Sequence, residues 1–259
     1  MKISIITVCY NSALTIRDTF ESVLNQTYSD IDYVVVDGNS SDETVSIIKK
    51  YKKKFSGRMR WISEIDNGLY DAMNKGIKMS TGEIIGILNS DDCYASNNVL
   101  KQVVDKILNN NIDSCYGNLL YVKKNKPYRY WRSGPYESFI SGWMPPHPAF
   151  FVKKEIYNKY GLFRLDCGVN ADYELMLRFL EIKNISTEWI DKIIVYMNVG
   201  GKSNRNLNSR INAIVDNKIA WNVNNIKPHF YTIVLKRLRK IPQYIKAMFL
   251  KNYIKLELI

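Results

Sequence analysis

The sequence is poor in the residues on which disulfide-linked proteins and histidine-rich metalloproteins depend. Its 259 residues include four cysteines and two histidines, and no two cysteines form a Cys-x-x-Cys pair. Scattered cysteines of this kind exclude a disulfide framework and a cysteine zinc site, and they indicate reduced thiols in a cytosolic protein. A metal centre built from several histidines is excluded as well.

Long apolar runs are also missing. No stretch approaches the roughly 20 apolar residues that a membrane-spanning helix needs. The chain opens on Met1-Lys2 and a strand pattern, without the features of a signal peptide. We therefore expect a cytoplasmic protein that could still bind the inner face of the cell membrane from outside the bilayer.

Negative charge is scarce, and the resulting positive excess lies mostly at the C-terminal end. The formal net charge is +12, of which residues 227–259 carry +7 from eight Lys and Arg and one Glu. Residues 226–259 interleave these cations with aromatic and aliphatic residues, a composition typical of an interfacial helix on anionic lipid. A helix packed on the domain with its lysines in water would have the same composition.

The first hundred residues alternate between strand and helix patterns. Strands are predicted at 2–8, 31–37, 58–63 and 83–88, with amphipathic helices between them. This alternation predicts a mostly parallel sheet that binds a nucleotide. Neither G-x-x-x-x-G-K nor G-x-G-x-x-G occurs, so a metal would have to hold the nucleotide phosphates.

The second half has a mixed pattern. Strands are predicted at 113–122, 128–132, 150–152 and 189–196, and a helix begins at Asn170. The polar, glycine-containing stretch at 200–209 is predicted to be a flexible lid.

Two adjacent carboxylates end the most apolar strand of the first half, in the stretch IIGILNSDD at 84–92. Ligands of open α/β sheets bind beyond the carboxyl ends of the strands, so Asp91 and Asp92 are expected at the mouth of a crevice. Paired carboxylates there suit Mg²⁺ or Mn²⁺. A turn with a helix cap would use the same residues.

Five short motifs then occur in order. They are TVCYN at 7–11, VVVDGNSSDET at 34–44, EIDNGLYDAMNKGI at 64–77, NSDD at 89–92 and NADYELMLR at 170–178. Together they resemble the family 2 glycosyltransferases over roughly residues 1–200. The resemblance implies an α/β GT-A fold, a nucleotide-sugar donor, a divalent cation and inversion at the anomeric carbon. With the basic tail set apart by its composition, we expect a glycosyltransferase domain at 1–225, with a nucleotide-binding half at 1–95 and an acceptor half at 96–225, and a basic helical tail at 226–259.

The resemblance also implies a donor site. Thr7 and Tyr10 would line the base pocket, Asn11 would belong to the same donor contacts, and Asp37 would accept the imide N–H of uracil or thymine, which favours a UDP-sugar. Asp66 would hold the base or the ribose. Core packing for Tyr10, a helix cap for Asp37 and a turn for Asp66 are the structural alternatives.

The metal and the base are implied in the same way. Asp91 would lie by the ribose and the metal, and Asp92 on the metal, Mn²⁺ or Mg²⁺. Relatives often carry Asp where this chain has Asn89, which leaves the division of roles between the two open. Asp172 matches the family's general base, which takes the proton of the acceptor hydroxyl; it also suits a helix N-terminus, and Glu174 is the rival base.

Two further residues have open roles. His147 matches a position near the acceptor cleft, where relatives often carry histidine, or it is a structural histidine. Arg178 would touch the diphosphate or pair with an acid.

The acceptor is expected to be a glycan or a polyprenyl-linked sugar of surface polysaccharide or lipopolysaccharide assembly. The Gln-x-x-Arg-Trp signature of processive synthases is absent, so one sugar per visit is expected. Residues 227–259 would bind anionic membrane, and no nucleic acid is expected because the tail suits lipid better. A sugar-1-phosphate nucleotidyltransferase and a non-enzymatic polyanion-binding protein are the alternative functions.

Overall fold

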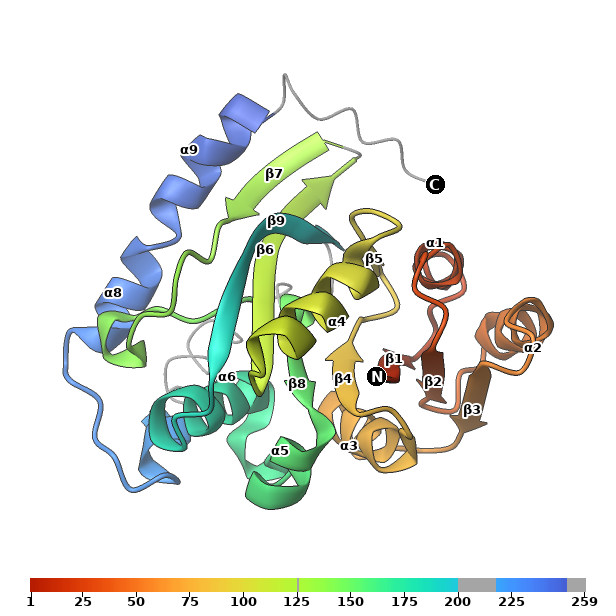
Figure 1. Ribbon diagram of the computed structural model, residues 1–259, viewed down its shortest axis with the longest axis horizontal. Coiled ribbons are helices and arrows are strands. Elements are labelled where there is room, and N and C mark those ends of the chain that lie inside the picture. The colour runs from red at the N-terminus through yellow and green to blue at the C-terminus, as the bar shows by residue number, and fades with distance from the viewer. Residues whose placement is uncertain (125, 200–217, 251–259) are drawn as a thin grey trace.

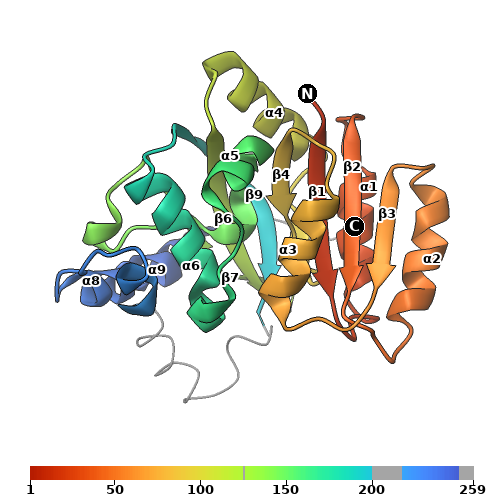
Figure 2. The same cartoon turned by 90° about the horizontal axis from the view of Figure 1, so that it is seen from below.

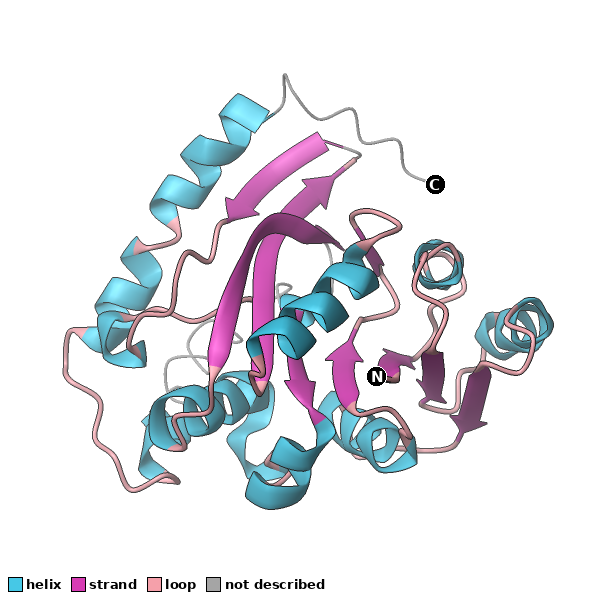
Figure 3. Cartoon of the chain, in the orientation of Figure 1, coloured by secondary structure: helices cyan, strands magenta, loops and turns pink. Residues whose placement is uncertain are grey.

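The computed structural model describes residues 1–124, 126–199 and 218–250, which form one mixed sheet with helices on both faces (Figures 1 and 3). The strand order is β3-β2-β1-β4-β8-β6-β9-β5, and β7 pairs with β6 beside this path. The strands are β1 (Ile3–Cys9), β2 (Ile31–Asp37), β3 (Met59–Ser63), β4 (Ile84–Ile87), β5 (Asp92–Tyr94), β6 (Ser114–Lys123), β7 (Lys126–Trp131), β8 (Phe150–Lys153) and β9 (Thr187–Asn198). The α-helices are α1 (Ile16–Leu24), α2 (Thr44–Lys54), α3 (Leu69–Met79), α4 (Val99–Asn110), α5 (Lys154–Tyr160), α6 (Ala171–Met176), α8 (Thr232–Leu238) and α9 (Ile241–Leu250).

The first half is the parallel unit that the sequence predicts. β1 pairs in parallel with β2 and β4, and β2 with β3. Every residue of β1 and β2 is buried, because helices cover both faces of the sheet. Ile5 packs in one apolar cluster with Phe20 of α1, whereas its neighbour Ile6 packs in another with Met73 of α3. The carboxyl ends of these strands therefore meet at one edge.

The second half is mixed, also as predicted. β8 runs antiparallel to β4 and β6, β6 runs parallel to β9, and β9 runs antiparallel to β5. The return of β9 pairs Met197 with Asp92. Asp92 is thus the first residue of a short strand, whereas the sequence places it in a loop beyond a strand.

The C-terminal helices α8 and α9 pack on the domain, along β7 and the 3₁₀ turn at Phe139–Ser141 (Figures 1 and 2). The Thr232 hydroxyl donates to the Ile140 carbonyl at 2.9 Å, and the Tyr244 ring lies edge-on to Tyr128, with centroids 5.5 Å apart. Gly142 adopts a φ of 76°, and a Cβ there would overlap the backbone nitrogen of Lys236 in α8. The helix is thus in direct backbone contact with the domain.

The same two helices leave an apolar face in solvent. Six of its side chains are more than half exposed, Met248 and Phe249 at 65% and 70%. The six are Val234, Leu238, Ile241, Ile245, Met248 and Phe249. No helix in the part of the chain that the structure describes is both long and apolar enough to cross a bilayer. The lid predicted at 200–209 and the end of the predicted tail at 251–259 lie outside the described residues.

The contact at Gly142 gives a test of how the tail is docked. Gly142→Ala should lower the free energy of unfolding by the cost of a left-handed alanine, about 1–2 kcal/mol, plus about 1–3 kcal/mol for the overlap with α8. Gly134→Ala is the matched control, since Gly134 has a φ of 71° with open space around its Cβ position. Urea unfolding of both variants measures the difference; equal losses would mean that α8 is not held against Gly142.

Candidate active site

The predicted donor residues gather at the carboxyl ends of β1, β2 and β3. Tyr10 follows β1 with its ring half exposed, and Asp66 lies in the loop between β3 and α3. Between them is Gly38, where a Cβ would lie 2.6 Å from Asp66 Oδ2 and 3.5 Å from Tyr10 Cδ2. The missing side chain of Gly38 therefore lets an aromatic face and a carboxylate approach each other, an arrangement suited to a nucleobase.

Asp37 is completely buried at the end of β2. Its Oδ2 accepts the Ser40 N–H at 3.0 Å and the Ser63 hydroxyl at 2.7 Å, and its Oδ1 accepts the Ser40 hydroxyl. Asn11 joins the same loop, because its Oδ1 accepts the Ser41 N–H at 2.9 Å. These contacts hold the turn after β2 against the end of β1. A contact of Asp37 or Asn11 with a base stays a prediction.

Thr7 lies deeper than a base-pocket residue would. It has no accessible surface, and its Oγ1 lies 2.9 Å from the hydroxyl of Tyr33, which is also fully buried. In this structure Thr7 supports the donor edge from within the core.

The Asp92 carboxylate is fully buried at the start of β5. Its Oδ2 accepts the Asn89 side-chain amide at 3.2 Å, but its Oδ1 and the Asn89 Oδ1 have no hydrogen-bond partner among the described residues. Asp91 is half-buried beside it, and the Asn198 side chain donates to the Asp91 carbonyl at 2.8 Å. Two buried oxygens thus lack the donors that such groups normally have.

The electrostatics of this pair fit a divalent cation. Burial raises the pKa of Asp92 well above its usual range, and the charge of Asp91 raises it further; burial also raises the pKa of Asp91. A hard cation on these oxygens would relieve the cost of burying the carboxylates. No cluster of three or more His, Cys, Asp or Glu side chains suited to a metal occurs within the described ranges. The remaining ligands would therefore come from a substrate or from water.

Asp172, the predicted base, lies in the first turn of α6 and is half-buried. Burial lowers the pKa of the neighbouring His147, and the negative charge of Asp172 partly opposes this effect. Burial also raises the pKa of Tyr70, and the charge of Asp172 raises it further. Sequence reasoning missed Tyr70, although it lies within the motif at 64–77. His147 is buried, with its ring edge-on to Phe163 at 5.5 Å between centroids.

The side chain that relates the two acidic sites is Tyr121 of β6. Burial raises its pKa, the Arg129 guanidinium opposes that shift, and the charges of both Asp92 and Asp172 add to it. Arg129 covers the Tyr121 ring at 3.9 Å from its centroid. The charges of both acids therefore act on Tyr121.

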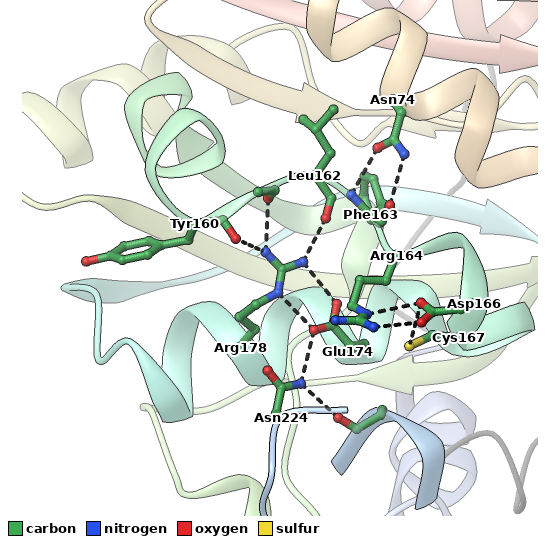
Figure 4. A network of polar contacts seen from close by, with 12 residues as sticks. Asn74, Tyr160, Leu162, Phe163, Arg164, Asp166, Cys167, Glu174, Arg178 and Asn224 are labelled. Carbon is green, nitrogen blue, oxygen red and sulfur yellow. Dashed lines mark hydrogen bonds and ion pairs between the residues drawn. The ribbon is translucent and has the colours of Figure 1, made fainter. Parts of the chain in front are cut away.

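Glu174 is not a base, contrary to the alternative drawn from the sequence. It has no accessible surface, and it forms a two-pronged ion pair with Arg178, at 2.8 Å to Nε and 3.0 Å to Nη2 (Figure 4). Arg178 also donates to the carbonyls of Tyr160, Gly161 and Leu162 at the end of α5. Of the two roles considered for Arg178, pairing with an acid is correct.

Asp172 lines a cavity of about 340 Å³. Its walls come from the segment that follows β7, from α6 and from α8 and α9. That volume is at the lower end of the range for small-molecule sites. Lys236 of α8 belongs to this wall, and no feature of the sequence connects it with Asp172, 64 positions earlier.

Comparison with known proteins agrees with this geometry. The sequence model of the family described as glycosyl transferase family 2 matches residues 4–171. An uncharacterised glycosyltransferase of Mycobacterium tuberculosis is 30% identical over 186 residues, 68% of each chain. A PGL/p-HBAD biosynthesis glycosyltransferase of Mycobacterium bovis is 27% identical over 203 residues, 78% of each chain.

Solved structures share the fold at low identity. A crystal structure of S. aureus TarS matches with a TM-score of 0.68 at 18% identity, over 99% of this chain and 76% of that one; TarS has also been crystallised with UDP and with UDP-GlcNAc. The mannosyltransferase PcManGT of Pyrobaculum calidifontis, in complex with GDP-Man and Mn²⁺, matches with a TM-score of 0.65 at 15% identity, over 99% and 77%. With the predicted motifs in place on this sheet, the chain belongs to glycosyltransferase family 2 and has the GT-A fold.

Proposed function

We propose that the protein moves one sugar from a UDP-sugar to the hydroxyl of a glycan or lipid-linked acceptor, with inversion and with Asp172 as the general base. The observation that carries the proposal is the placement of Asp172 in the wall of a cavity, with Tyr121 in electrostatic range of both Asp172 and the buried Asp92. In an inverting displacement, one carboxylate accepts the proton of the incoming hydroxyl. Other carboxylates, here a pair, serve the leaving group.

The donor would bind at the edge formed by Tyr10, Gly38 and Asp66. The exposed Tyr10 ring offers a face for the base, and Asp66 Oδ2, close over Gly38, offers an acceptor for an imide or ribose hydrogen. Asp37 would hold the turn after β2 in position beneath this edge. UDP in complexes of TarS supports a uridine donor, whereas PcManGT carries a guanosine donor, so the base is part of the proposal.

Asp92 and Asp91 would hold Mn²⁺ or Mg²⁺. When bound, the cation would neutralise the diphosphate that leaves the sugar. Asp172 accepts the proton of the acceptor hydroxyl, whose oxygen forms the new bond to the anomeric carbon as the bond to the diphosphate breaks. The buried Glu174–Arg178 pair keeps α6, and with it Asp172, in position.

The exposed apolar face of α8 and α9 would lie on an anionic membrane. Its six apolar side chains recur at helical spacing. The exposed Lys246 belongs to α9, and the exposed Lys240 lies in the turn between α8 and α9. Apolar area together with neighbouring cations is the combination by which interfacial helices bind anionic lipid. This position would bring the enzyme to a lipid-linked acceptor of surface polysaccharide or lipopolysaccharide synthesis.

The two alternative functions gain no support. The two mycobacterial relatives reported above are glycosyltransferases and PcManGT is a mannosyltransferase, and none of the three is named as a nucleotidyltransferase or a nucleic-acid-binding protein. The apolar stripe on the basic helices also suits lipid better than a solvated phosphate backbone.

Removal of the Asp92 charge tests the metal site. UDP with Mn²⁺ should raise the melting temperature of the wild type more than UDP with EDTA, and Asp92→Asn should lose most of that difference. Asp105→Asn, on the surface of α4, is the control. A metal-dependent shift that survives in Asp92→Asn would remove Asp92 from this role.

Without metal, the stability of the same variant should depend on pH differently from that of the wild type. Because the folded-state pKa of Asp92 is raised, the wild type should lose stability as the pH rises from about 4 towards that raised pKa. Asp92→Asn has no such loss, so its melting temperature relative to the wild type should climb over the same range. A difference that does not change with pH would contradict the electrostatics of this site.

Asp172→Asn tests the base. Turnover should fall by about 10²–10⁴-fold, the usual contribution of a positioned base, while the affinity for UDP stays unchanged because Asp172 does not touch the nucleotide. The assay is UDP release from the UDP-sugar that the wild type consumes fastest. Asp166→Asn, at an exposed acid six residues earlier, is the matched control. Near-normal turnover in Asp172→Asn would exclude it as the base.

Vesicle binding tests the apolar face. Met248→Ser/Phe249→Ser should weaken binding to phosphatidylglycerol-containing vesicles by about tenfold or more, because each side chain contributes roughly 1.5–3 kcal/mol when fully buried. Leu14→Ser/Leu108→Ser removes two exposed apolar side chains elsewhere and should leave binding unchanged. Co-sedimentation measures both, with UDP affinity as the check on folding. Equal binding by the two variants would mean that this face is not the membrane contact.

A further inference from the structure

The hydroxyl of Tyr70 crosses from the first half of the chain to the segment that carries Asp172. Tyr70 lies in the first turn of α3, and its hydroxyl donates to the Val169 carbonyl at 2.9 Å, a contact between residues 99 positions apart. Val169 lies in the 3₁₀ segment Leu165–Asn170, which leads directly into α6. A side chain of the first half therefore holds the backbone just before the candidate base.

The ring of Tyr70 is fixed by packing. It is half-buried and lies against the Phe163 ring, with centroids 5.4 Å apart. Asn74, one turn further along α3, exchanges two hydrogen bonds with the Phe163 backbone (Figure 4). Because one helix supplies both the phenol and the amide that anchors its packing partner, the Tyr70 hydroxyl has a defined position.

The Tyr70 hydroxyl also meets Asp172 itself. Burial raises the pKa of Tyr70 most; the charge of Asp172 and the approach of its carboxylate to the phenol raise this pKa further, and the Asp172 N–H opposes them. Asp172 Oδ1 accepts the Tyr173 N–H at 2.7 Å, so one of the two carboxylate oxygens is held by the backbone. The phenol is thus a second group, from a distant part of the chain, that acts on the same carboxylate.

Tyr70 is also close in sequence to the proposed donor edge. Asp66 precedes it by four residues, and Asp66 Oδ1 accepts the Gly68 N–H at 2.8 Å, which folds this loop back onto the start of α3. The Asn67 N–H donates to Asp71 of the same first turn at 3.0 Å. A short, internally hydrogen-bonded segment therefore carries both Asp66 and Tyr70.

We propose that Tyr70 is the positioning residue of the base: its hydroxyl fixes the direction of the Asp172 carboxylate relative to the donor edge that contains Asp66. The inference rests on the proposed function, because it requires Asp172 to accept the proton of the acceptor hydroxyl. A misplacement of reacting groups by about 1 Å can lower a rate by about 10²-fold. A base that is held from the segment that carries Asp66 keeps its distance to the reacting carbon. The rival role for Tyr70 is purely structural, a contact that only holds the two halves of the chain together.

Tyr70→Phe removes the hydroxyl and keeps the ring that packs on Phe163. Turnover, assayed as UDP release, should fall by about ten- to a hundredfold, the usual effect of losing a hydrogen bond to a charged group. The KM for the UDP-sugar should stay unchanged, because Tyr70 would act on the base and not on the nucleotide. Tyr28→Phe is the matched control: Tyr28 is half-buried as well, and its hydroxyl donates to the Met1 carbonyl at 2.7 Å, at the amino end of β1. This variant should turn over normally.

A double-mutant cycle separates positioning from a structural role. If Tyr70 acts through Asp172, Tyr70→Phe/Asp172→Asn should turn over within about twofold of Asp172→Asn alone, because the group that Tyr70 positions is already gone. A hydroxyl that only joins the two halves would add its own loss, and the two fold-changes would multiply. Calorimetry of UDP binding to all variants shows whether the donor site stays intact.

The outcomes distinguish this inference from the proposed function. Normal turnover in Tyr70→Phe, losses that multiply in the double variant, or a loss of UDP affinity in Tyr70→Phe overturns the role of Tyr70. Near-normal turnover in Asp172→Asn would instead refute the proposed base. The proposed function stands, and this inference fails alone, when Asp172→Asn is impaired and the second substitution lowers turnover further.

Discussion

The carboxylate of Asp92 is the most demanding group of this structure, because it is buried without the donors that a charge needs. Unpaired burial of a carboxylate costs several kcal/mol, and neither oxygen of Asp92 meets a cation among the described residues. The pairing of β5 with β9 and the hydrogen bond from Thr19 to the Asp92 carbonyl hold it there. A fold that keeps such a group in place gives up stability to do so.

The second half of the chain is held to the first half by polar contacts of a different kind. Asn74 of α3 exchanges two hydrogen bonds with the backbone of Phe163, each 2.9 Å long (Figure 4). The Glu174–Arg178 ion pair joins α6 to the helical turn that follows it. The Asn224 side chain, from the segment before α8, donates to Glu174 as well. Because these groups are buried and mutually satisfied, Asp172 stands on a rigid support.

Much of the first half could be predicted because its signals are local. Period, turns and capping residues define the strands and helices one at a time, and the carboxyl ends of parallel strands must share an edge, which is where the structure places Tyr10, Asp37 and Asp66. The family and the fold were confirmed. Features that depend on distant pairing could not be predicted: β5 forms only because β9 returns to it, and the Thr7 hydroxyl is paired within the core because Tyr33 of the neighbouring strand lies beside it. The composition of the tail allowed two interpretations, because it is the same for a packed helix and for a lipid-bound one. In the structure, one side of α8 and α9 packs on the domain and the other side is exposed.

The division of the cavity wall has an evolutionary consequence. The match of the family model ends at residue 171, whereas Lys236, Lys240 and Lys246, which line the cavity, come from α8, from the turn after it and from α9, in the last part of the chain. The segment that carries Tyr10, Asp37 and Asp66 and the outer wall of the cavity are therefore encoded by separate stretches of the gene. A lineage can exchange or rewrite the C-terminal stretch by recombination and so reshape this wall, while the first stretch is inherited unchanged.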